Sequence, residues 1–184
     1  MSEVSWYRYS DNWLDVKQSA RTTIGREGSG KYPSDEWKKK ILLAEHSPIR
    51  KIKFSWRWTD LKYWVATHFV RHKVGIEFWQ STQRTDRTGI SRDELPQSAL
   101  VSLECEANAQ AIINISRKRL CNQASPETRE AWKQVVEAIA ENDPILASVC
   151  VADCIYRGTC CEMNPCGYAD TEDYQRRLKE YRSV

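Results

Sequence analysis

A basic stretch rich in hydroxyl and amide groups, HFVRHKVGIEFWQSTQRTDR, runs from His68 to Arg87. Arg71, His72 and Lys73 stand side by side in it, and a spacer of seven residues separates Lys73 from Ser81. Guanidinium, hydroxyl and amide groups donate hydrogen bonds that suit phosphate oxygens and the polar edges of a base. The stretch therefore indicates a site for an anionic, nucleotide-like ligand.

The alternative without a ligand is that this stretch is a solvated helix end followed by a polar loop, because charge runs usually lie on the surface. The net charge of +3 on 184 residues is too small to indicate general nucleic-acid binding. It is compatible with an anionic small substrate. We therefore predict no obligatory nucleic-acid partner.

A second set of polar side chains surrounds the segment Arg119-Leu-Cys-Asn-Gln-Ala124-Ser-Pro-Glu127. Asn114 stands five residues before Arg119, and Asn108 stands six residues before Asn114. Each has a structural alternative, because an asparagine can be a helix-side amide and an arginine can complement a helix C-terminus. Two ordered motifs with matched internal spacing favour a functional interpretation of both.

Together, the motifs resemble the flavin-dependent thymidylate synthases. Arg-His-Lys, seven residues and Ser resemble that family's Arg-His-Arg-x7-Ser signature, and the Arg119–Glu127 segment is similar to a second family motif. The order of helix, His46-Ser47-Pro48 loop, strand, helix and Arg-His is also that of the family. The resemblance covers about residues 44–140 and indicates a divergent, phage-type member.

The resemblance implies a fold, a reaction and an assembly. The family fold is α/β of the α+β type, with a twisted, mainly antiparallel sheet flanked by helices. The family methylates dUMP to dTMP with methylene-tetrahydrofolate as carbon donor, FAD as hydride carrier and NADPH as reductant, in a homotetramer with sites between subunits. The protein then supplies positioning and electrostatics. A related pyrimidine hydroxymethylase and a non-catalytic nucleotide- or nucleic-acid-binding module, with tryptophans as stacking faces, are the alternatives.

The resemblance also assigns roles by position. Arg119 would contact the pyrimidine and stabilise negative charge on a ring carbonyl, which makes it the catalytic candidate. The residues implied to bind the flavin cofactor are Ser47, Arg71, His72, Lys73, Asn108, Asn114 and Gln123. Those implied to bind the deoxypyrimidine monophosphate are His68, Ser81, Thr82, Gln83, Arg84 and Arg119. No metal ligand is implied.

Several positions depart from the family pattern. Lys73 replaces an arginine and so lacks its planar fork of donors. Gln83 stands where the family has a phosphate-binding arginine, although Arg84 follows directly. Trp79 takes the place of a substrate-side glutamate, and Gln123 that of a flavin-side histidine. These departures leave flavin binding better supported than the exact pyrimidine or product.

The elements expected to position these residues follow from periodicity and from capping and turn residues. We predict one domain over 1–184, since the chain is long enough for a core and shows no linker. Residues 1–31 are expected to be a loosely packed N-terminal segment, and 85–100 a loop. Ile52, Phe54, Trp56 and Trp58 alternate with polar residues, which predicts a strand. Helices are predicted at 34–44, 60–71 with Thr59 or Asp60 as cap, 103–120, 126–142 and 170–184.

Seven cysteines are present, five of them within 150–168. Without a secretory signal, they indicate reduced thiols in the cytoplasm. The segment could hold zinc or an iron–sulfur cluster, but its spacing is not that of paired CxxC zinc sites. We therefore interpret it as free thiols in packing and turns. No apolar run approaches 18 residues, so no membrane span is predicted.

Overall fold

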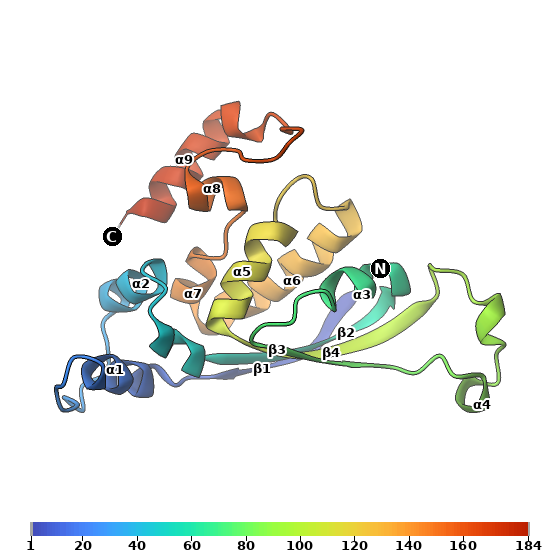
Figure 1. Ribbon diagram of the computed structural model, residues 1–184, viewed down its shortest axis with the longest axis horizontal. Coiled ribbons are helices and arrows are strands. Elements are labelled where there is room, and N and C mark those ends of the chain that lie inside the picture. The colour runs from blue at the N-terminus through green and yellow to red at the C-terminus, as the bar shows by residue number, and fades with distance from the viewer. Residues whose placement is uncertain (1, 184) are drawn as a thin grey trace.

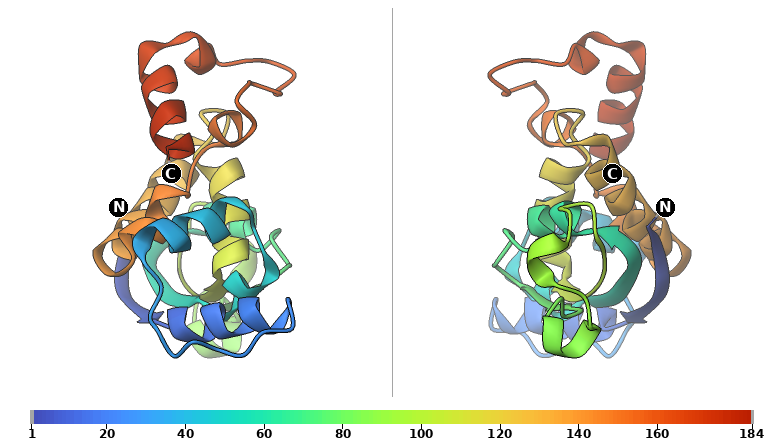
Figure 2. Two further views of the ribbon diagram at one scale, coloured as in Figure 1. Left: turned by 90° about the vertical axis from the view of Figure 1, so that its left-hand side faces the viewer. Right: turned by 90° about the vertical axis from the view of Figure 1, so that its right-hand side faces the viewer.

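Four antiparallel strands form one twisted sheet in the computed structural model, which describes residues 2–183 (Figure 1). The strands are β1 (Glu3–Ser10), β2 (Lys53–Lys62), β3 (Ile76–Gln80) and β4 (Leu100–Asn108), in the order β1-β2-β4-β3. The helices gather mainly on one face of this sheet, as Figures 1 and 2 show. This arrangement confirms the predicted α+β fold.

The helices are short apart from one. Their bounds are α1 (Trp13–Thr22), α2 (Asp35–Leu43), α3 (Tyr63–Phe69), α4 (Thr85–Thr88), α5 (Ala109–Arg119), α6 (Pro126–Asn142), α7 (Pro144–Ser148), α8 (Asp153–Arg157) and α9 (Glu172–Arg182). Three turns of 3-10 helix are η1 (Ser47–Lys51), η2 (Arg92–Glu94) and η3 (Tyr168–Asp170). Among the described residues no helix is long and apolar enough to cross a membrane.

The two faces of the sheet differ in the way that the alternation of β2 requires. Trp56 and Trp58 are fully buried and meet Trp132 of α6 with ring centroids 5.8 and 6.4 Å away. On the opposite face Lys53 and Glu106 form an ion pair of 2.8 Å between neighbouring strands. An apolar face buried under helices and a charged face toward solvent are typical of an antiparallel sheet.

Local signals predicted several helices well. Ser34 caps α2 by accepting a hydrogen bond from the Trp37 amide, and Ser125 caps α6 with Pro126 in its first turn. The helix predicted at 170–184 is present as α9, with Val184 outside the described residues, and it buries Tyr174 and Tyr181. Capping residues act within a few positions, which is why sequence alone located these ends.

The helix predicted at 60–71 is shorter than expected. Strand β2 continues through Lys62, with Leu61 paired to Val101, so α3 begins only at Tyr63. Neither Thr59 nor Asp60 caps it, and Asp60 has a left-handed φ of 53° beside a bulge. Arg71, His72 and Lys73 consequently lie in the turn after the helix and not in its last turn.

The helix predicted at 103–120 is wrong over its first third. Leu103, Cys105 and Ala107 are buried in alternation and pair with β2, so 103–108 is strand β4, and helix α5 starts at Ala109. Leu103, Ala107 and Ala111 also match helical spacing, so the local pattern was ambiguous. Strand β3 was missed within the predicted polar stretch, and the 85–100 loop contains α4 and η2.

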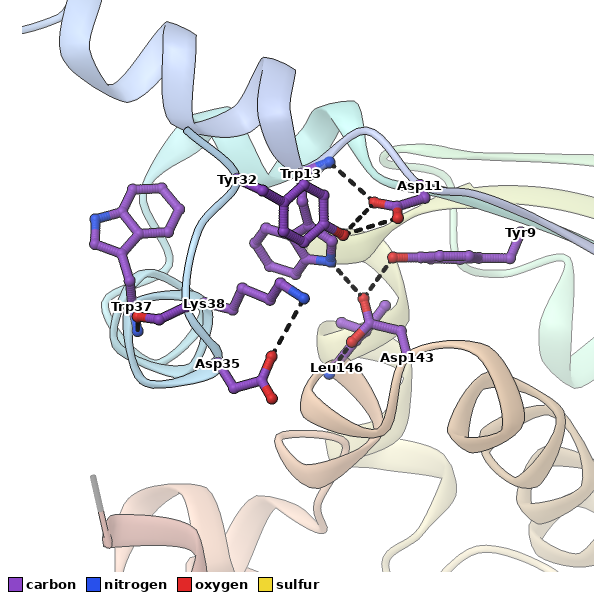
Figure 3. Close-up of polar contacts among 10 residues, drawn as sticks. Tyr9, Asp11, Trp13, Tyr32, Asp35, Trp37, Lys38, Asp143 and Leu146 are labelled. Atoms are coloured by element: carbon purple, nitrogen blue, oxygen red, sulfur yellow. Dashed lines mark hydrogen bonds and ion pairs between the residues drawn. The ribbon is translucent and has the colours of Figure 1, made fainter. Parts of the chain in front are cut away.

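The N-terminal segment is far more ordered than predicted. It forms β1 and α1, and its side chains converge on Asp143 between α6 and α7 (Figure 3). Asp143 is only 4% exposed, and its carboxylate accepts hydrogen bonds from Tyr9 Oη at 2.6 Å and Trp13 Nε1 at 2.7 Å. Its other oxygen accepts from the Leu146 amide at 2.9 Å. We call these four residues the Asp143 hub.

Candidate functional site

Arg119 joins the two motifs in one cluster. Its Nε donates a hydrogen bond to Nε2 of His72 at 2.9 Å, and its Nη2 donates to the main-chain carbonyl of His68. The two bonds link residues 47 and 51 positions apart in the sequence. We call His68, Arg71, His72 and Arg119 the cationic cluster. Residues from the two motifs therefore lie together in the folded chain.

Charge in the cationic cluster is one-sided. Burial and the nearby Arg119 lower the pKa of His72 to about 4, so its imidazole is neutral and accepts the Arg119 bond. Burial, then Arg119 and Arg71, lower the pKa of His68. Burial and Arg71 also lower the pKa of Arg119 itself. Among residues 2–183 no carboxylate forms an ion pair with these four groups.

Helix ends position the cluster. Arg119 is the last residue of α5, and His68 lies on the last turn of α3. The Nδ1 of His68 is 2.9 Å from the Thr128 hydroxyl, which is buried and accepts a hydrogen bond from Ser125 Oγ at 2.7 Å. The cap of α6 thus also fixes the His68 ring. Thr128 was not singled out from sequence, although the Ser-Pro-Glu helix start lies beside it.

A groove of about 490 Å³ opens at the N-terminal end of α5. It has mainly polar walls, formed by Glu45, Arg50, Val74, Gly75, Asn108, Gln110, Ala111 and Asn114. Both asparagines predicted to hold flavin therefore line the same groove. The loop that carries Arg71 to Lys73 forms its rim, because it ends at Val74 and Gly75.

Asn108 has a structural role in addition to any ligand. Its Oδ1 accepts from the Ala111 amide and caps α5, while its main-chain N–H donates to the Gly75 carbonyl at 2.9 Å. Gly75 has a φ of 75°, and a Cβ there would meet the Asn108 side chain at 2.5 Å. Asn108 therefore clamps the end of the cation-bearing loop onto α5.

The acid in the groove was missed by sequence reasoning. Glu45 ends the α2 segment with a left-handed φ of 51°, forms an ion pair with Arg117 and accepts from Gln110 at 2.6 Å. Arg117 also donates to Asn114 at 3.1 Å. These contacts hold Gln110 and Asn114 against one wall. They span up to 72 residues, and no local pattern indicates them.

The remaining predicted residues lie elsewhere. Ser81 extends the β3–β4 ladder, and Arg84 forms an exposed ion pair with Asp86, so this segment lies at the opposite end of β3 from Gly75. Six residues of strand span roughly 20 Å. The predicted phosphate-binding segment of Ser81, Thr82, Gln83 and Arg84 is thus separated from the groove within one chain.

Three further predicted residues occupy exposed positions. Ser47 begins η1 between Glu45 and Arg50 of the groove, and Lys73 lies on the loop at the rim. The Gln123 amide donates to the Asn164 carbonyl at 2.5 Å and so ties to the C-terminal segment. Ser47 and Lys73 are compatible with their predicted roles, whereas Gln123 has a structural contact.

Comparison with known proteins shows which solved structures share this fold. No family model and no curated protein matches this sequence. Solved structures do match: the UMP/dUMP methylase PolB from Streptomyces cacaoi, bound with 5-Br dUMP, has a TM-score of 0.62 at 15% identity over 81% of this chain and 93% of that chain. The flavin-dependent thymidylate synthase ThyX from Helicobacter pylori, complexed with FAD and dUMP, has a TM-score of 0.62 at 14% identity over 82% and 99%. The likeness confirms the fold that the motifs predicted.

Proposed function

We propose that this chain is a divergent flavin-dependent enzyme of the thymidylate synthase type. In this proposal it binds FAD and dUMP and transfers a one-carbon unit from methylene-tetrahydrofolate to C5 of the pyrimidine, giving dTMP. The observation on which this proposal rests is the cationic cluster, in which the two motifs meet through the hydrogen bond from Arg119 to His72 and with which no carboxylate of residues 2–183 forms an ion pair. The enzyme folds that resemble this chain support the same reaction class.

The groove and its rim fit a flavin dinucleotide. Arg71 and Lys73 are exposed, and neither forms an ion pair or a side-chain hydrogen bond with any other residue of 2–183. Cations without protein partners suit a pyrophosphate, and the amides of Gln110 and Asn114 offer donors and acceptors. When bound, FAD supplies hydride transfer; the chain supplies binding, orientation and charge.

In the proposed reaction Arg119 acts on the pyrimidine. Its Nη1 donates to no group among the described residues, while Nε and Nη2 are fixed by His72 and the His68 carbonyl. One edge of the guanidinium is therefore held and another is free for a ring carbonyl. A held donor stabilises charge that develops in the transition state without reorganising first. Neutral His72 orients this donor without competing for the anion.

The proposed site needs more than one copy of the chain. A groove of about 490 Å³ suits one drug-sized ligand and not FAD, nucleotide and folate together. The segment from Ser81 to Arg84 is also roughly 20 Å along β3 from Gly75. In a homotetramer with shared sites, another copy brings this segment to the groove. NADPH as reductant completes the proposed reaction.

The test combines cofactor binding with turnover. The purified protein is expected to carry flavin absorbance, and with methylene-tetrahydrofolate and NADPH to release tritium from 5-tritiated dUMP. Mass spectrometry of the product separates a methyl from a hydroxymethyl group, the alternative raised by Trp79 in place of a glutamate. Replacing Arg71 and His72 by alanine should abolish FAD retention in a folded protein. Wild-type protein that does not quench FAD fluorescence contradicts the proposal.

A further inference from the structure

Five cysteines from three chain segments line one small cavity. Cys121 follows α5, Cys154 lies in α8, and Cys160, Cys161 and Cys166 belong to the loop 158–167. The cavity measures about 20 Å³, close to the volume that one water-sized sphere occupies. Sequence spacing had grouped Cys150 with these residues. The structure instead buries Cys150 elsewhere, with its Sγ donating to the Leu146 carbonyl at 3.4 Å.

Four of these thiols influence one another. Burial raises the pKa of Cys121, and Glu162, Cys166 and Cys160 raise it further. Burial also raises the pKa of Cys154, as do Cys121 and Cys160. The raised pKa values keep these thiols protonated in the free protein, and the observation that points to a ligand is the cavity that they line together.

The loop that carries three of the thiols has little else to hold it. Residues 158–167 contain no helix or strand, and none of them is buried. Met163 is 98% exposed, and the polar ties are the Gln123 bond to Asn164 and a 4.0 Å ion pair between Lys118 and Glu162. Segments that bury too little apolar surface are commonly stabilised by a disulfide or a structural metal. All seven cysteines are free thiols here.

We propose that Cys121, Cys154, Cys160 and Cys166 bind a single structural zinc ion, a site independent of the proposed enzymatic function. Four sulfur ligands match tetrahedral zinc, and a cavity of about 20 Å³ takes one ion rather than an iron–sulfur cluster. As the described side chains stand, no three Cys, His, Asp or Glu groups are arranged to hold a metal ion. The thiols therefore rotate about χ1 on binding and release their protons to solvent.

The two acids that line the cavity, Asp153 and Glu162, are both paired with cations. Lys118 lies 3.3 Å from Asp153 Oδ2 and 4.0 Å from Glu162, and Arg157 lies 2.9 Å from Asp153 Oδ2, so neither acid adds an unpaired negative charge beside the thiols. Cys121 is also two residues from Arg119. The ion would fasten the turn after α5 to the C-terminal segment and so position the end of the helix that carries Arg119.

The test is metal content of the full chain. Protein expressed with zinc and purified without chelator is expected to contain about one zinc per chain by plasma mass spectrometry. Replacement by Co²⁺ should give the intense d–d and thiolate charge-transfer absorption of four sulfur ligands. Cys160→Ser should lower the zinc content at least tenfold. Cys150→Ser, whose thiol lies outside the cavity, should retain it, and so should Cys161→Ser, which removes the one cavity-lining thiol that is not among the four proposed ligands.

Each result decides the proposal. Wild-type protein without zinc that also takes up no Co²⁺ overturns it, and so does a Cys160→Ser protein that keeps its metal. If Cys160→Ser is insoluble, the Co²⁺ spectrum of the wild type and the retained zinc of Cys161→Ser still decide it. Because no readout depends on turnover, an inactive protein with bound zinc contradicts only the proposed function.

Discussion

The Asp143 hub and the cationic cluster are opposite ways to arrange polar groups. In the hub one buried carboxylate accepts from a phenol, an indole and a main-chain amide, so each group has its complement (Figure 3). In the cationic cluster two arginines and two imidazoles lie together, and the pKa values of His68, His72 and Arg119 are all lowered by burial and by neighbouring cations.

The Asp143 hub is typical of a network that stabilises the fold, whereas the cationic cluster is typical of a functional site. A satisfied buried network stabilises a fold, and here it fastens β1 and α1 to the junction of α6 and α7. A cluster of like charge destabilises the free protein, and such clusters are typical of binding and catalytic sites. The comparison predicts that mutations in the hub change stability, whereas mutations in the cluster change binding and rate.

The largest expected effect is the loss of the hub carboxylate. Asp143→Ala leaves the Tyr9 hydroxyl, the Trp13 indole and the Leu146 amide without an acceptor, and each bond to a charged group contributes about 1.5–3 kcal/mol. We expect the free energy of unfolding in urea to fall by about 4 kcal/mol. Asp11→Ala removes an exposed acceptor of Tyr32 and a long bond of 3.3 Å from the Trp13 main-chain amide; it is the control and should cost under about 1 kcal/mol. Equal losses of stability in Asp143→Ala and Asp11→Ala would show that the Asp143 hub stabilises the fold no more than an exposed hydrogen bond does.

The second effect belongs to the cluster and depends on the proposed function. Arg119→Lys keeps the charge but loses the fork that bonds both His72 and His68, so turnover should fall by roughly 10²–10³ while fold and flavin remain. Arg129→Lys is the matched control, since Arg129 lies two residues after the same motif and its side chain donates, among residues 2–183, only to the carbonyls of Asn122 and Ala124. Turnover of Arg119→Lys within about threefold of wild type would reduce Arg119 to a helix-end cation.

Sequence alone predicted what depends on neighbours along the chain. The α6 start was readable because Ser125 and Pro126 act within one turn, and the two motifs were readable because their spacing is internal. Leu103 and Ala107 fit both a strand and a helix, and only pairing with β2 decides between them. The Asp143 hub joins residues 130 and more positions apart, so no window of sequence contains it.

The same limit applied to the candidate site. Arg119 and His72 were both identified, but their mutual hydrogen bond, and the fact that no acid of residues 2–183 forms an ion pair with either, depend on the tertiary structure. Glu45 gave no signal because its role rests on a left-handed φ and on Arg117 across the groove. Cys121 was seen only as part of a motif, and the cavity that joins it to Cys160 depends on how α8 packs near α5.

A third effect is the pH dependence of the free energy of unfolding that comes from His72, which amounts to about 2 kcal/mol. His72 has a pKa of about 4 when folded and an ordinary value near 6.5 when unfolded. The unfolded chain therefore binds the proton first as pH falls, and stability decreases between about pH 6.5 and 4. Linkage allows roughly 3 kcal/mol, and the partial exposure of His72 reduces it.

Urea unfolding of wild type and His72→Gln across this pH range isolates the contribution, since carboxylates titrate in both. The wild-type curve should fall more steeply on acidification, and the variant should lose about 2 kcal/mol less. His46→Gln, an exposed histidine outside the cluster, should follow the wild type. Parallel curves for all three proteins would show that His72 does not experience the one-sided charge.

The smallest expected effect concerns the contact between Gly75 and Asn108, at the end of the loop that carries Arg71 and Lys73. Gly75 and Gly89 have nearly the same left-handed φ, 75° and 72°, but a Cβ at Gly75 would meet Asn108 at 2.5 Å and one at Gly89 would meet nothing within 4 Å. Gly89→Ala should therefore cost only the backbone strain, about 1 kcal/mol, and Gly75→Ala about 2 kcal/mol or more, because Asn108 is held by its cap on α5.

Asn108→Ser shortens the clashing group and keeps a capping oxygen, so in that background Gly75→Ala should cost no more than Gly89→Ala does. Urea unfolding of the four variants measures both differences. If Gly75→Ala and Gly89→Ala cost the same in the wild-type background, Asn108 does not clamp the loop, and the rim of the groove depends on the ligand rather than on the fold.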